Sequence, residues 1–173
     1  WPSCGDIDGD GRDEVVVGQG PWLANGGRWF AYDDAIAGFA LLGSARVPLD
    51  AYNQACGETR PACGDFDGDG RDEVAIGLGP TPTSGGRVAI FSGLVFQRWA
   101  RVPWAAYNSA RGETWPAAGD VDGDGRDELL LGLGPFPPYG GWLVLLDDAR
   151  SGFATLAWRR LPWSAYDAGN GET

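Results

Sequence analysis

One nine-residue acidic sequence occurs three times and constrains this chain more than any other feature. The copies are Asp6-Ile7-Asp8-Gly9-Asp10-Gly11-Arg12-Asp13-Glu14, Asp65-Phe66-Asp67-Gly68-Asp69-Gly70-Arg71-Asp72-Glu73 and Asp120-Val121-Asp122-Gly123-Asp124-Gly125-Arg126-Asp127-Glu128. Acids at alternate positions present oxygen atoms around one point, and the glycines between them permit a tight turn. Because the carboxylates would repel one another without a cation, the pattern is typical of a calcium-binding loop.

We expect each loop to bind one Ca²⁺ ion, giving three ions per chain. Carboxylates of the first, third, fifth and ninth residues and the backbone carbonyl of the seventh residue would provide the ligands. The predicted ligands are Asp6, Asp8, Asp10, Arg12 and Glu14; Asp65, Asp67, Asp69, Arg71 and Glu73; and Asp120, Asp122, Asp124, Arg126 and Glu128. The remaining acids, Asp13, Asp72 and Asp127, are expected to point outward. Asp and Gly also favour turns that hold no metal, but such turns do not require every acid to keep its position in three copies.

The sequence after the loop separates this pattern from the EF-hand. An EF-hand needs a bidentate acid at position twelve and a helix on either side of its loop. Position twelve here is Val17, Ile76 or Leu131, within a short apolar run of strand character. The loop is therefore expected to lead into a strand, and Glu14 and its counterparts are expected to close the ligand shell.

The whole chain divides into three tandem repeats, residues 1–59, 60–114 and 115–173. In each repeat, a short strand enters the acidic loop and the apolar strand follows it. A third strand is predicted at 28–32, 87–91 and 142–146, and an outer strand at 39–47, 96–102 and 153–161. A long connection then leads to the next repeat. Four antiparallel strands with a long exit predict an all-β chain of three β-propeller blades.

The repeats resemble the FG-GAP/VCBS family, which builds calcium-binding β-propellers in integrin α subunits and in secreted bacterial proteins. The resemblance covers the whole chain and is most specific in the acidic loop, the strand after it and the Gly-x-Gly-Pro that ends this strand, as in residues 77–80. The Phe-Gly half of the family signature is absent, and Gly112-Glu113 stands where it would fall. This departure favours the bacterial branch. The resemblance implies that the ions clamp the hairpin between the first two strands of a blade.

Composition excludes several classes of protein. The net charge of −11 argues against a nucleic acid or an anionic membrane as partner, since both require basic surfaces. No histidine is present, which excludes histidine-based triads and zinc sites with histidine ligands. Weak calcium loops of this kind suit the millimolar calcium found outside cells, so we expect a secreted protein.

The three cysteines, Cys4, Cys56 and Cys63, make an odd number, which does not favour a disulfide framework. Cys4 and Cys63 occupy the same repeat position, where the third repeat has Ala118. A small buried side chain is therefore favoured over a bridge. A Cys56–Cys63 disulfide remains open.

The sequence favours a non-catalytic binding or adhesion module, lectin-like or protein-binding. The best acid–base candidates, Glu58, Glu113 and Glu172, recur in every repeat, and a residue repeated in this way is expected in the joint between blades. We therefore expect no catalytic residue and no enzyme activity. Aromatic residues that do not repeat are the candidate ligand contacts: Trp22, Phe136 and Tyr139. The alternatives are a structural self-assembling subunit and a non-catalytic part of a larger secreted enzyme.

Three blades are too few to close a propeller, which ordinarily has about four to eight. Placing Thr173 before Trp1 recreates the junctions Thr59-Arg60 and Thr114-Trp115, so the end of one chain is suited to meet the start of another. We expect a homodimer that closes a ring of six blades, with a filament or part of a longer propeller as alternatives.

Overall fold

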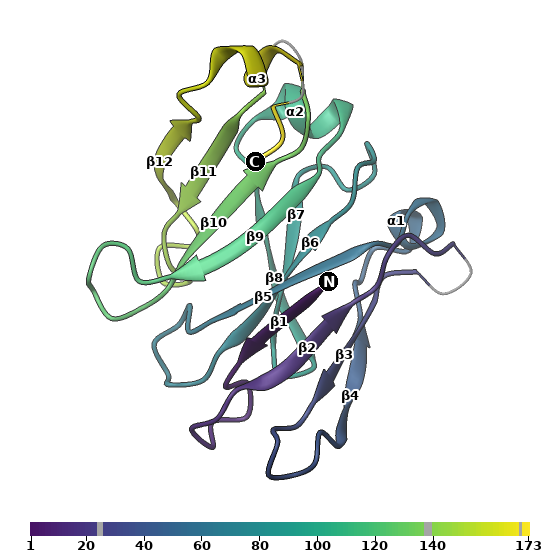
Figure 1. Ribbon diagram of the computed structural model, residues 1–173, viewed down its shortest axis with the longest axis vertical. Coiled ribbons are helices and arrows are strands. Elements are labelled where there is room, and N and C mark those ends of the chain that lie inside the picture. Colours follow the sequence, from purple (N-terminus) through teal and green to yellow (C-terminus); the bar gives the residue numbers. More distant parts are fainter. Residues whose placement is uncertain (24–25, 137–139, 170) are drawn as a thin grey trace.

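The computed structural model describes residues 1–23, 26–136, 140–169 and 171–173. These residues form three four-stranded antiparallel sheets, each with its strands in sequence order (Figure 1). The first sheet contains β1 (Pro2–Gly5), β2 (Glu14–Gly18), β3 (Arg28–Tyr32) and β4 (Leu41–Arg46). The second contains β5 (Thr59–Gly64), β6 (Glu73–Leu78), β7 (Arg87–Ser92) and β8 (Val95–Arg101). The third contains β9 (Thr114–Gly119), β10 (Glu128–Leu133), β11 (Trp142–Leu146) and β12 (Thr155–Arg160). The predicted all-β class and the three four-stranded units are confirmed.

A six-residue helix lies in each connection that leaves a sheet. These helices are α1 (Asp50–Ala55), α2 (Ala105–Ala110) and α3 (Ser164–Gly169). They were not predicted, because fewer than two helical turns show no readable periodicity. Tertiary contacts hold them: Asn53 Nδ2 donates to the carbonyl of Val47 at 2.7 Å, and Asn108 repeats this bond to Val102 at 2.7 Å. In the part of the chain that is described, no helix is long and apolar enough to cross a membrane.

The three sheets lie side by side, with the first strand of each innermost. β5 contacts both β1 and β9 near the middle of the molecule, and β4 and β12 lie at its edges (Figure 1). β5 begins at Thr59, one residue before the predicted repeat boundary. Thr59 pairs with Leu78 of its own sheet, while its N–H donates to the carbonyl of Gln19 at 2.9 Å in the first sheet. This threonine therefore fastens two sheets together, as does Thr114 between the second and third.

The core consists of the contacts between successive sheets. One apolar cluster joins the first and second sheets, and another joins the second and third. Every residue of β6 is buried, because neighbours cover both faces of the middle sheet. In β2, by contrast, buried and half-buried residues alternate, since the face of the first sheet that points away from the second has no neighbour among the described residues. We call the contact between two successive sheets a joint.

Candidate metal centres and the joints between sheets

Each acidic loop connects the first two strands of its sheet and is organised by its first aspartate. Asp6 Oδ1 accepts hydrogen bonds from the backbone N–H groups of Gly9 at 2.7 Å and Asp10 at 3.1 Å, and Oδ2 accepts one from Gly11 at 2.9 Å. Asp65 makes the same three bonds in the second loop. Gly9 and Gly11 have φ of 82° and 87°, values that glycine adopts without steric cost. The backbone of the loop thus wraps around the carboxylate of its first aspartate.

Carboxylate oxygens converge in all three loops. Within each group below, one oxygen from each residue lies within 4.8 Å of the others. The groups are Asp6, Asp8 and Asp10; Asp65, Asp67 and Glu73; Asp120, Asp122 and Glu128; and Asp8, Glu14 and Asp33. Three carboxylates so close together form a donor set suited to a hard divalent cation.

The ninth residue of each loop is a buried glutamate with a carboxylate oxygen that lacks a hydrogen-bond partner in the described residues. Glu14 Oε2 accepts from the N–H of Ile7 at 2.9 Å, whereas its Oε1 accepts no bond. Glu128 shows the same division, and both oxygens of Glu73 lack a partner. A buried carboxylate without a partner is costly, and a cation among these oxygens would supply the missing interaction. The residues present therefore fit Ca²⁺.

Burial also raises the pKa of these glutamates. The pKa of Glu73 rises to about 8, first because the side chain is buried and then because Asp67, Asp69 and Asp65 are close. Burial raises the pKa of Glu14 and Glu128 in the same direction. The ionised form of these glutamates is therefore favoured only when a cation is present in the loop.

The fifth residue of the loop converges with the other acids only in the first loop, at Asp10. Asp69 and Asp124 are outside the groups of converging oxygens, and Asp124 Oδ2 instead pairs with Arg126 Nη1 at 2.8 Å. In every loop the N–H of the seventh residue donates to the fifth aspartate at 2.9 Å; these residues are Arg12, Arg71 and Arg126. Sequence reasoning missed Asp33, which follows β3. The signal was an aspartate at the same place in the third repeat, Asp147, but the second repeat has Ser92 there.

The prediction that Asp72 and Asp127 point outward was wrong. Asp72 Oδ2 accepts from the N–H of Asp6 at 3.1 Å, and Asp72 N–H donates to the Asp6 carbonyl at 2.8 Å. Asp127 makes the same pair of bonds to Asp65, at 3.1 and 3.0 Å. These contacts arise because each loop lies against the loop of the preceding sheet. Asp13, which has no preceding loop in this chain, is exposed.

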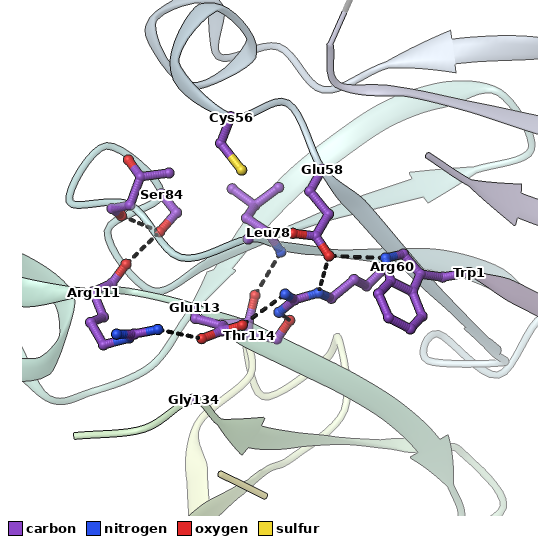
Figure 2. A network of polar contacts seen from close by, with 12 residues as sticks. Trp1, Cys56, Glu58, Arg60, Leu78, Ser84, Arg111, Glu113, Thr114 and Gly134 are labelled. Atoms are coloured by element: carbon purple, nitrogen blue, oxygen red, sulfur yellow. Dashed lines mark hydrogen bonds and ion pairs between the residues drawn. The ribbon is translucent and has the colours of Figure 1, made fainter. Parts of the chain in front are cut away.

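A buried arginine connects both joints near the middle of the molecule (Figure 2). Arg60 Nε lies 3.0 Å from Glu58 Oε1, and Arg60 Nη2 lies 2.7 Å from Glu113 Oε1. The guanidinium carbon is 3.5 Å from the centroid of the Trp115 ring, within range of a cation–π interaction. Trp1 Nε1 donates to Glu58 at 2.9 Å. Glu58 and Glu113 thus lie in the joints.

The three candidate ligand contacts have different environments. Trp22 is 61% exposed after β2, whereas Phe136 packs edge-on against Trp104 and Tyr107 at centroid distances of 5.4 and 5.6 Å. Tyr139 lies outside the described residues. Phe136 is therefore part of the packing between the second and third sheets.

An apolar groove that sequence reasoning missed lies at the same joint. It is lined by Pro103, Trp104, Trp142 and Trp158 and has a volume of about 480 Å³. Trp104 repeats as Trp163, which favoured a packing role, and Trp104 does pack on Phe136. The repeats did not indicate that the Trp104 indole also lines an open groove. The groove depends on Trp142, and the other two repeats have an arginine, Arg28 or Arg87, at the position of Trp142.

No disulfide is present: Cys4, Cys56 and Cys63 are all free. Burial raises the pKa of the Cys63 thiol to about 12, so this side chain is unreactive and serves as packing. Cys4, at the same repeat position, is exposed because no sheet precedes the first one in this chain.

Solved structures match the fold over nearly the whole chain. Bacillus licheniformis rhamnogalacturonan lyase PL11 matches with a TM-score of 0.61 and 16% identity, covering 97% of this chain and 35% of the lyase. Rhamnogalacturonan lyase YesW matches with a TM-score of 0.58 and 18% identity, with the same coverage of 97% and 35%. The chain thus spans about a third of the length of these proteins. No curated protein matches the sequence.

The expectation that the chain is not an enzyme is overturned by this comparison, since both matching structures are enzymes. That expectation rested on the equivalence of the three repeats. A symmetric scaffold does not exclude chemistry, because catalytic groups are added to a fold at particular loops and leave its repeats intact. At this level of identity the similarity shows the fold.

A family model matches the middle of the chain. Residues 65–131 match the FG-GAP-like repeat. This stretch begins with the second acidic loop and ends after the third, so it contains the motif on which the resemblance was based. The predicted resemblance is confirmed over residues 65–131, which are similar to the FG-GAP-like repeat.

Proposed function

We propose that this chain is a calcium-stabilised β-propeller unit of an extracellular protein, with one Ca²⁺ in each acidic loop. The observation that carries the proposal is the buried glutamate of each loop, which has an oxygen without a partner beside two aspartate carboxylates. The FG-GAP-like match supports the same reading. Extracellular calcium concentrations suit exposed loops of this type.

The role of the ions in this proposal is structural. Bound Ca²⁺ would neutralise the clustered carboxylates of Asp65, Asp67 and Glu73 and of their counterparts. Contacts between the loops and the rest of the chain would then stabilise the fold. The glutamate anchors the loop to the strand after it, and the first aspartate fixes the turn. Through the bonds from Asp6 to Asp72, an ordered first loop also holds the second sheet in place.

Replacing the buried glutamate of one loop should remove one site. Glu73→Gln keeps the shape of the side chain but removes its charge, so the number of bound ions should fall by about one per chain. Glu14→Gln and Glu128→Gln should each do the same for their own loops. Asp50→Asn is the matched control, because Asp50 is exposed and outside every loop. Equilibrium dialysis against millimolar Ca²⁺, with elemental analysis of both chambers, measures the count, and an unchanged count in all three glutamine variants contradicts the assignment.

We further propose that the unit binds an acidic polysaccharide in the groove between the second and third sheets. The indoles of Trp104, Trp142 and Trp158 offer flat apolar faces on which sugar rings can pack. An adjoining hollow of about 440 Å³ is lined by Arg101, whose charge suits a carboxylate. Both matching structures are named rhamnogalacturonan lyases, so rhamnogalacturonan is the ligand to test, for binding and for cleavage.

Two tryptophan variants test the groove. Trp158→Ala should weaken binding of rhamnogalacturonan oligosaccharides by roughly tenfold or more, because it removes one wall of the groove. Trp22→Ala is the control, since Trp22 is exposed elsewhere and was one of the three candidates predicted from the sequence. Isothermal titration measures both affinities, and circular dichroism verifies that each variant is folded. Equal affinities in folded Trp158→Ala and wild type would exclude the groove as the binding site.

A further inference from the structure

We infer that the three acidic loops bind Ca²⁺ with unequal affinity, that Asp33 is a further ligand of the first loop, and that the second loop is the weakest site. The loops differ in the residue that follows the apolar part of the third strand of each sheet. This residue is Asp33 after β3, Ser92 at the end of β7 and Asp147 after β11. The order of affinities rests on the calcium sites proposed above and predicts which of them fills last.

Asp33 lies beside the first acidic loop. Tyr32 pairs with Val15 in the ladder between β2 and β3, so the next residue, Asp33, stands opposite Glu14. Carboxylate oxygens of Asp8, Glu14 and Asp33 lie within 4.8 Å of one another. Glu14 is fully buried, and its Oε1 has no hydrogen-bond partner in the described residues. A cation bound to the loop through Asp8 and Glu14 would therefore also have Asp33 as a ligand.

A backbone hydrogen bond fixes the side chain of Asp33. Its Oδ1 accepts from the N–H of Asp34 at 2.8 Å. Asp147 is the counterpart of Asp33 in the third sheet, and its Oδ1 accepts from the N–H of Asp148 at 2.9 Å. Both aspartates are half-buried. We therefore expect the third loop, like the first, to bind Ca²⁺ more tightly than the second.

The second loop has a serine at the position of this acid. Ser92 pairs with Glu73 in the ladder between β6 and β7, which is the place that Asp33 takes in the first sheet. Glu73 is buried, and both of its carboxylate oxygens lack a hydrogen-bond partner in the described residues. Ligand charge is one of the factors that set calcium affinity, and a hydroxyl is neutral. The second site therefore has one charged ligand fewer than the first.

An arginine lies beside the second loop. Arg98, on β8, lines a cavity of about 160 Å³ together with Glu73 and Ser92. Although the arginine is exposed, its Nη1 donates to the carbonyl of Ala149 at 3.0 Å, which holds the guanidinium at this place. The strand registers give the residues at the same position in the other two sheets, which are Gly43 and Ala157. The second loop is therefore the one that has a cation at this position.

The first and second loops form a matched pair, since another sheet follows each of them in the described chain. Relative to the first loop, the second has one carboxylate fewer and one guanidinium more, a change of two charges. Ser92 and Arg98 belong to the same sheet as their loop, so this difference does not depend on neighbouring repeats. Both exchanges disfavour a bound dication. We expect the second loop to bind Ca²⁺ roughly tenfold more weakly than the first.

Titration of Ca²⁺ into the chelator-stripped full chain, followed by calorimetry, tests this order. The wild type should show a weakest binding step that the Glu73→Gln variant lacks. Ser92→Asp supplies the acid found in the other two repeats, so it should tighten this step by roughly tenfold. Ser109→Asp is the matched control, because it adds the same charge on the exposed surface of α2 and should leave every step unchanged. A gain in affinity cannot arise from a misfolded variant.

Two further substitutions test the contributing residues separately. Asp33→Asn should weaken the binding step of the first loop by roughly tenfold and leave the second loop unchanged. Arg98→Ala should tighten the step of the second loop, and the gain should shrink at high salt because exposed charges are screened. Arg159→Ala removes an exposed arginine outside the loops and serves as its control. Circular dichroism verifies that each variant is folded.

Three sites of equal affinity overturn the inference, as does a weakest step that persists in folded Glu73→Gln. A Ser92→Asp variant that binds no more tightly than Ser109→Asp also overturns it, and so does a first-loop step that Asp33→Asn leaves unmoved. These results would leave the calcium sites themselves standing, since only their ranking is rejected. Absence of any calcium binding, by contrast, overturns both the sites and their ranking.

Discussion

Replacing Arg60 with alanine is expected to destabilise the chain by about 3–5 kcal/mol. The arginine is buried between two buried glutamates, Glu58 and Glu113, and lies on the ring of Trp115. Removing it leaves Glu58 buried without a cation and Glu113 with only the more distant Arg111 Nη2, at 3.6 Å, in addition to the lost cation–π contact. Because Arg60 contacts both joints, the loss should appear in the unfolding of the whole chain. Urea denaturation of Arg60→Ala and wild type measures the difference.

A surface ion pair provides the control for this prediction. Asp50→Ala breaks the pair that Arg46 Nη1 makes with Asp50 at 3.2 Å, in which the aspartate side chain is 79% exposed. Such a pair contributes less than about 1 kcal/mol. Adding Glu58→Gln and Glu113→Gln to the Arg60→Ala variant should restore part of its stability, since the charges left without a partner are then gone. If Arg60→Ala costs no more than Asp50→Ala, the ion network does not hold the joints.

Removal of calcium is expected to have the second large effect, a fall in melting temperature on the order of 20 °C. A site at a hundredfold excess of ligand over Kd stabilises the folded state by about 2.7 kcal/mol, and three sites act together. For a chain of this size each kcal/mol corresponds to about 2–4 °C. The direction follows from the loops, because without the ions the clustered carboxylates repel one another and the buried glutamates lack a partner.

Melting curves recorded by circular dichroism in CaCl₂ and in excess EGTA measure this effect. Restoring Ca²⁺ should return the original curve, and the same concentration of Mg²⁺ should not, since Mg²⁺ requires a stricter octahedral shell and dehydrates reluctantly. A melting curve that chelation leaves unmoved contradicts a structural role for the loops.

The repeated loop and the strands around it were predictable from sequence because both depend on local order. The turn at Asp6 is fixed by glycines a few residues away, and the strand after Glu14 is visible as an apolar run. The outer strands were also found, although their ends moved by one or two residues, from the predicted 96–102 to Val95–Arg101 in the second sheet. Three copies of each signal reinforced the assignment.

The joints were predictable only in part. Repetition of Glu58 and Glu113 placed these residues there, but the contacts across a joint depend on how far apart two repeats lie in space. Asp72 reaches a backbone group 66 residues earlier, and no local pattern records that distance. The position of Asp33 beside Glu14 likewise follows from the pairing of β2 with β3. The exclusion of enzyme activity failed for a related reason, since equivalence among repeats describes the scaffold and leaves the chemistry of the surrounding protein undetermined.

Calcium titration into chelator-stripped protein tests the central claim most directly. Isothermal titration calorimetry of the wild-type chain should give three Ca²⁺ ions bound per chain, one for each acidic loop. Each of the variants Glu14→Gln, Glu73→Gln and Glu128→Gln should lose the binding heat of one site. Absence of binding at millimolar Ca²⁺, or a stoichiometry that the three variants leave unchanged, would contradict the assignment of the loops as calcium sites.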